Sequence, residues 1–132
     1  MTVITKKTEY AIISLMELAM LDEGKTMTTR SIAERQEIPV NLVTQILAEL
    51  HRAGLTGSVR GAGGGIFLKR DPSTINLREV AELIDGPLSI TRCTTPENQC
   101  KNIKSCDLRK IWLESQQALL NVLEQTTIKD LL

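Results

Sequence analysis

The chain has 132 residues, 42% of them hydrophobic, and its 16 basic and 16 acidic side chains cancel. This length suits one compact domain with an appended element, and the hydrophobic fraction is too high for a disordered chain. Residues 1–70 carry nine Lys or Arg against seven Asp or Glu, whereas residues 71–132 carry seven against nine. This weak asymmetry permits phosphate binding by the first half and does not by itself indicate it.

Targeting and catalytic signals are missing from the sequence. No apolar stretch reaches membrane-spanning length and the start lacks a signal-peptide pattern, so we expect a cytoplasmic protein without membrane contact. A single histidine, His51, argues against histidine-based catalysis, and we expect no enzyme activity. In a reducing compartment the cysteines are interpreted as ligands or reactive thiols before disulfides.

The first half of the chain predicts three helices. Residues 7–21 form the first, and residues 28–35 form the second with Thr28 or Thr29 as its cap. Pro39 suits the first position of the third, where a missing backbone N–H costs nothing. Apolar residues of this third helix recur at helical spacing on one face, namely Val43, Ile46, Leu47 and Leu50.

The second and third helices, joined by a tight turn, predict a helix-turn-helix. Asn41, Thr44 and Gln45 lie opposite the apolar face of the third helix. These short uncharged side chains can form hydrogen bonds with base edges, and Asn and Gln match adenine. A polar face in a small helical bundle would give the same pattern, so these helices alone leave DNA binding open.

Residues 56–70 predict a β-hairpin with strands near 57–60 and 66–69. A helix-turn-helix followed by a hairpin is a winged helix, whose tip contacts DNA. Glycines allow close approach to phosphates, and an arginine reaches phosphate or a narrow minor groove. The candidate contacts at the tip are Arg60, Gly61, Gly63 and Gly64. A nucleotide-binding glycine loop is disfavoured, since Ile66 replaces its third glycine and no Gly-Lys-Ser/Thr follows.

The second half predicts a short helix at 75–84, a polar loop at 91–106 and a long helix at 107–125. The long helix carries a stripe that is too apolar to face water on a lone helix. That stripe consists of Leu108, Ile111, Ser115, Leu119 and Val122. We therefore expect the 107–125 helix to pack against another apolar surface.

The expected organisation is mainly α, with three parts in chain order. Residues 1–88 form a winged helix-turn-helix DNA-binding domain with a small β-hairpin wing. Residues 89–106 form a cysteine sensor loop, and residues 107–132 form a long C-terminal dimerisation helix with a terminal turn.

The three cysteines, Cys93, Cys100 and Cys106, lie in the polar loop with spacing C-x6-C-x5-C. Zinc sites usually contain C-x2–4-C pairs, which are missing here. Three thiolates on one loop could bind an iron–sulfur cluster with a fourth ligand from elsewhere. Zinc, redox-active thiols and inert thiols remain open on spacing alone.

Several segments together resemble the Rrf2 family of bacterial winged-helix regulators. They are ITKKTEYAI, IAERQEIPVNLVTQILAELHRAGL, SVRGAGGGIFL and LREVAELIDGPL. The resemblance implies a homodimer with an antiparallel pair of long helices. It also implies that Cys93, Cys100 and Cys106 match the cluster-binding cysteines of those members that carry a cluster.

The fourth ligand departs from one pattern of the family. Some members have a histidine three residues after the last cysteine, where this chain has Arg109, which does not bind iron. Others use an acidic residue in the first helix of the partner subunit, and that position matches Glu9. The alternative for Glu9 is a first-turn acidic residue favoured by the helix dipole.

The resemblance implies a homodimeric regulator, expected to be a repressor, that binds a double-stranded DNA operator. A 2Fe–2S or 4Fe–4S cluster would control this binding by sensing iron, redox state or nitric oxide. A thiol-based or zinc-based regulator without a cluster is the alternative.

Overall fold

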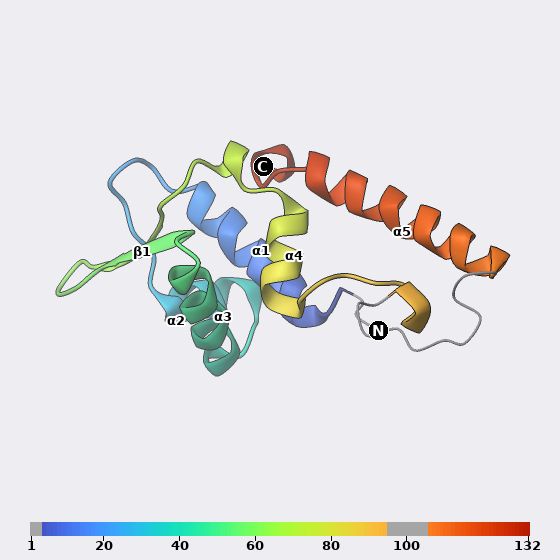
Figure 1. The fold of residues 1–132 in the computed structure, drawn as a ribbon. Coiled ribbons are helices and arrows are strands. Elements are labelled where there is room, and N and C mark those ends of the chain that lie inside the picture. Colours follow the sequence, from blue (N-terminus) through green and yellow to red (C-terminus); the bar gives the residue numbers. More distant parts are fainter. Residues whose placement is uncertain (1–3, 95–105) are drawn as a thin grey trace.

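The computed structural model describes residues 4–94 and 106–132. Its helices are α1 (Lys6–Ala19), α2 (Thr29–Gln36), α3 (Val40–Arg52), α4 (Leu77–Asp85) and α5 (Asp107–Gln125). The strands are β1 (Thr56–Val59) and β2 (Gly65–Leu68), and 3-10 turns cover Pro72–Thr74, Arg92–Thr94 and Lys129–Leu131. The expected mainly α winged helix-turn-helix with a long C-terminal helix is confirmed (Figure 1).

Local capping sets the helix boundaries within a residue or two of the expected ones. The Thr28 hydroxyl accepts a hydrogen bond from the Ser31 N–H at 3.0 Å, which makes Thr28 the cap of α2 and places Thr29 first in the helix. Pro39 is the N-cap of α3, one position before the expected one. Between the two helices Glu37 adopts a left-handed φ of 54°, which closes the tight turn.

One hydrophobic core joins the first four helices to the wing and to the C-terminal turn. Its central side chains, among them Leu15, Ile32, Ile46 and Ile128, are fully buried. Burial of each such side chain stabilises the fold by about 1.5–3 kcal/mol. The apolar face of α3 packs into this core, so its polar face is left outward.

The wing is the antiparallel hairpin of residues 56–68, which projects from the body on the side opposite α5 (Figure 1). Gly57 pairs with Phe67, and a Cβ at Gly57 would lie 2.5 Å from the Phe67 ring. The backbone of Met27 adds a further bridge, since Met27 and Ile66 exchange N–H···O bonds of 2.9 and 2.8 Å. The wing is thereby attached to the connection between α1 and α2.

Helix α5 extends beyond the body (Figure 1) and is attached to it near its C-terminus. Near its C-terminus, Leu120 is buried against Ala81 and Leu88, and the Ile128 N–H donates to the Ile75 carbonyl at 2.9 Å. Of the expected apolar stripe, four side chains are 39–62% exposed, namely Leu108, Ile111, Leu119 and Val122. The described helices include none that is long and apolar enough to cross a membrane.

The first turn of α1 is bound to the end of α4 by one carboxylate. The Asp85 oxygens accept hydrogen bonds from the Thr5 N–H (3.1 Å), the Thr5 hydroxyl (2.7 Å) and the Thr8 hydroxyl (2.7 Å). Burial alone would raise the pKa of Asp85, but these hydrogen bonds outweigh it and hold the pKa below its ordinary value of 3.8. The ionised carboxylate therefore stabilises the folded state.

Replacing Asp85 by Asn should make this stabilisation visible as a pH dependence. A depressed folded-state pKa gives stability that is present above the unfolded-state pKa and lost as the pH falls through the folded-state value. We expect Asp85→Asn to lower the free energy of unfolding by about 1–2 kcal/mol at pH 7. The gap to the wild type should close as the pH falls below 3.8, measured by urea unfolding across pH. Asp22→Asn, at an exposed carboxylate, is the control; a gap that stays constant with pH would contradict the assignment.

Candidate nucleic-acid interface and cysteine site

The outer face of α3 carries the side chains expected to read bases. Asn41, Thr44 and Gln45 are exposed, whereas the apolar residues of the same helix are buried. The Thr44 hydroxyl donates to the Val40 carbonyl at 2.9 Å, which leaves its oxygen able to accept from outside. The helix thus presents amide and hydroxyl groups on a fixed scaffold.

The wing tip has Arg60 exposed at the end of β1. Gly61 and Gly63 have φ of 96° and 76°, and a Cβ at Gly64 would lie 2.2 Å from the Val59 carbonyl oxygen. The glycines are therefore required by the turn of the wing itself. Their expected approach to phosphate remains a prediction.

The remaining candidate DNA contacts lie at the starts of α2 and α3. Thr28 and Pro39 are exposed, and Thr29 is half-buried. These residues lie at helix N-termini, where free backbone N–H groups attract phosphate. All candidate contacts occur on the helix-turn-helix and the wing.

Two of the three cysteines lie within the described residues. Cys93 lies in the turn Arg92–Thr94 and Cys106 is the N-cap of α5; both thiols are free and half-buried. The Cys93 sulfur is 3.0 Å from the Thr91 hydroxyl. Cys100 lies outside the described residues.

Arg109 connects these two cysteine-bearing segments. Its Nε donates a hydrogen bond of 3.2 Å to the Cys93 carbonyl oxygen, and it lies in the first turn of α5 behind Cys106. This arginine, at the position where some members of the resembled family have a histidine, thus connects the segment of Cys93 to the helix that begins after Cys106. Within residues 4–94 and 106–132, no group of three possible metal-binding side chains is assembled.

Glu9 lies in the first turn of α1 and is exposed. Its carboxylate is 3.0 Å from the Lys6 ammonium, and this hydrogen bond raises the pKa of Lys6. Glu9 is therefore an exposed first-turn residue, and its expected role as an iron ligand remains a prediction.

An ion pair that sequence reasoning did not predict connects α1 to α3. The Lys7 ammonium lies 2.7 Å from Glu49 Oε1, with both side chains about two-thirds buried. No local signal marks this pair, because its members are 42 positions apart. The first turn of α1 is thus bound to α4 through Asp85 and to α3 through Glu49.

Comparison with known proteins agrees with this architecture. The model of the Rrf2 family, described as an iron-dependent transcriptional regulator, matches residues 4–132. The regulator NsrR of Shouchella clausii is 33% identical over 97% of this chain and 87% of its own length. The regulator IscR of Escherichia coli is 30% identical over 97% and 78%.

Among solved structures, CymR, the global cysteine regulator of B. subtilis, superposes with a TM-score of 0.82. It is 28% identical, and the match covers 99% of this chain and 96% of CymR. These relatives are regulators by name, in agreement with the regulator rather than enzyme that the sequence predicts. The chain belongs to the Rrf2 family of transcriptional regulators.

Proposed function

We propose that this protein is a homodimeric DNA-binding regulator, acting as a repressor, whose operator binding is controlled by an iron–sulfur cluster. The observation that carries DNA binding is the division of α3 into a fully buried apolar face and an exposed face with Asn41, Thr44 and Gln45. Side chains of this kind on a helix-turn-helix read bases in the major groove.

Phosphate contacts come from the elements around α3. Arg60 at the wing tip supplies a charge, and Thr28 and Thr29 lie at the start of α2. Phosphate contacts fix the position of a protein on DNA, whereas base contacts give specificity. The two classes of residue therefore differ in how their removal changes binding.

Arg60→Ala and Gln45→Ala should separate these classes. Loss of one phosphate contact should weaken binding to all DNA sequences and lower the slope of log affinity against log salt by about one. Loss of a base contact should cost about 1–3 kcal/mol on the operator and little on unrelated DNA. Fluorescence anisotropy at several salt concentrations measures both. Lys129→Ala, in the exposed C-terminal turn, is the control; normal operator affinity in both test variants would refute the interface.

Dimerisation through α5 follows from its uncovered apolar stripe. Val122, Leu108 and Ile111 are each more than half exposed, and the stripe lies away from the contact of Leu120 with α4. A second copy of the helix would remove these side chains from water, with about 25 cal/mol gained per Å² of apolar surface. An antiparallel pair of such helices would give a dimer with two winged helices, one for each of two DNA half-sites about 34 Å apart.

Leu119→Lys should split the dimer, because a charge would enter the apolar contact. Sedimentation velocity at micromolar concentration should show a monomer for this variant and a dimer for the wild type. Gln117→Lys adds the same charge at an exposed position on the opposite side of α5 and should remain dimeric. A monomeric wild type would exclude the proposed interface.

The described cysteine residues fit a cluster site. Cys93 and Cys106 are free, half-buried thiols, and the hydrogen bond from Arg109 holds their segments together. With Cys100 they would supply three thiolates, and the partner subunit's Glu9 would supply a carboxylate. When bound, the cluster would respond to iron supply, redox state or nitric oxide through its stability on these ligands.

The contacts of α1 give a route from that site to the DNA-reading helix. Glu9 lies one turn from Thr5 and two residues from Lys7. Thr5 binds Asp85, which precedes the segment that carries Cys93, and Lys7 binds Glu49 on α3. Ligation of the cluster by Glu9 would thus act on the first turn of α1, which is bound to the recognition helix α3. Such a ligand shifts the population toward the state that binds it better.

The cluster is tested by spectroscopy of anaerobically purified protein. We expect charge-transfer absorption in the visible range, lost on Ala substitution of Cys93, Cys100 or Cys106. Glu9→Ala should leave a cluster that is lost faster on exposure to oxygen or nitric oxide, because carboxylate is a weak iron ligand whose loss opens one position. Dimerisation should be unchanged, and Glu34→Ala on α2 is the control.

Protein that stays colourless after anaerobic reconstitution with iron and sulfide would overturn the cluster. The free thiols of Cys93 and Cys106 would then favour a thiol-based or zinc-based regulator. Metal analysis would separate those two. An unchanged cluster lifetime in Glu9→Ala would leave Glu9 with only its ion pair to Lys6.

A further inference from the structure

A groove of about 610 Å³ lies at the base of the wing, away from the cysteine segments. Its walls are the end of α1 with the following loop, residues 18–26, and the second half of the hairpin with its exit, residues 67–72. This volume is within the range that holds a small organic molecule. We refer to it as the wing-base groove.

The floor of the wing-base groove is apolar. Leu18, Leu21, Phe67, Leu68 and Pro72 line it, and Phe67 is the only phenylalanine of the chain. Because Gly57 leaves room for the far end of the ring, Phe67 lies over the hairpin and forms one wall. An apolar body of a ligand would be shielded from water there.

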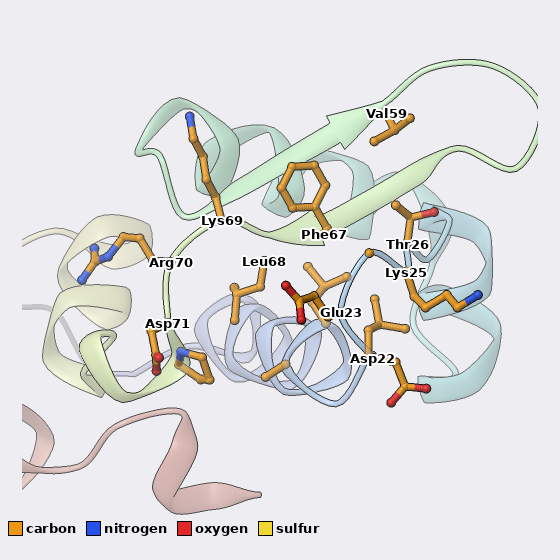
Figure 2. A pocket seen from close by; sticks show the side chains of 15 residues that line it. Asp22, Glu23, Lys25, Thr26, Val59, Phe67, Leu68, Lys69, Arg70 and Asp71 are labelled. Atoms are coloured by element: carbon orange, nitrogen blue, oxygen red, sulfur yellow. The ribbon is translucent and has the colours of Figure 1, made fainter.

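The charged side chains that line the groove differ in their direction and in their ion-pair partners. Figure 2 shows the Glu23 carboxylate among the side chains that line the groove, whereas Lys25 and Lys69 direct their ammonium groups outward. Arg70 also turns away, and it is paired with Glu79. Glu23 has no ion-pair or hydrogen-bond partner for its carboxylate among the described residues. Of the other two lining carboxylates, Asp71 accepts hydrogen bonds from Ser73 and Asp22 is directed away from Phe67 in Figure 2. The groove therefore offers the Glu23 carboxylate in a lining that also has apolar and aromatic side chains.

We propose that the wing-base groove binds an apolar organic cation, a primary amine in its ammonium form, with Glu23 as its counter-ion. The ammonium group would donate to the Glu23 carboxylate, a charge-assisted hydrogen bond. The aromatic ring of Phe67 favours a cation further, since its face is electronegative. This inference is independent of the iron–sulfur cluster.

The groove also adjoins the contacts that hold the wing. The loop that contains Glu23 continues into Thr26, whose hydroxyl donates to the Gly63 carbonyl at 3.3 Å, and into Met27, which is bridged to Ile66. A molecule between this loop and β2 would contact both sides of that connection. Occupancy of the groove should therefore change how the wing approaches DNA.

Binding is tested with fluorine NMR on the full chain. Incorporation of 4-fluorophenylalanine gives one signal, because Phe67 is the only site. The probe is 2-phenylethylamine, with 2-phenylethanol and 3-phenylpropionate as neutral and anionic controls of similar size. We expect a saturable shift with the amine at an affinity at least about tenfold above both controls, the size of one charged hydrogen bond.

Glu23→Gln should remove this preference, so that amine and alcohol bind alike, while Glu34→Gln on α2 should keep it. No saturable shift, equal binding of amine and alcohol by the wild type, or tighter binding of the anion would each overturn the amine site. None of these measurements needs DNA, so they stand apart from the operator assays.

The connection to the wing is tested by titrating operator DNA with saturating amine present. We expect the operator affinity to change about threefold or more, within the usual range of coupling between sites. By reciprocity, operator DNA should change the amine affinity by the same factor. Unchanged operator affinity with a filled groove would overturn the connection to the wing.

Discussion

The attachment of the first turn of α1 is the contact on which the rest of the arrangement depends. This turn is held from one side by Asp85 through three hydrogen bonds and from the other by the ion pair of Lys7 with Glu49. Both carboxylates are partly shielded from water, where a charged hydrogen bond is worth more than at an open surface. The turn therefore fixes the orientation of α3 and of the end of α4 at once.

Those elements of the fold that rest on local signals were predictable from the sequence. The apolar period of α3, the threonine caps and the glycine-rich tip between two short strands each specify their element within a residue or two. Helix α5 matches its expected bounds of 107–125, because its apolar stripe is long and its start follows a polar loop. Local periodicity and capping do not depend on the rest of the chain.

The contacts between elements were not predictable in the same way. The Lys7–Glu49 and Glu17–Arg35 pairs join residues far apart in sequence and have no spacing that marks them. The turn before α3 uses Glu37 in a left-handed conformation where a glycine would have given a signal. Within the candidate site, the residues on the outer face of α3 and at the wing tip could be predicted from the sequence. The hydrogen bond from Arg109 to the Cys93 carbonyl could be found only in the structure.

Helix α1 connects the two proposed ligand sites, the cluster ligand Glu9 and the wing-base groove, to the two elements proposed to contact DNA, α3 and the wing. Its 14 residues span about 21 Å, with Glu9 near one end and the residues that line the wing-base groove near the other. Ala11 and Leu15 between them are fully buried, so the helix is packed as a rigid unit. Its first turn contacts α3, and the loop after its last turn contacts the wing. A ligand at either end therefore acts on a different part of the same DNA-reading surface, and the effects of the two ligands on operator binding need not be additive.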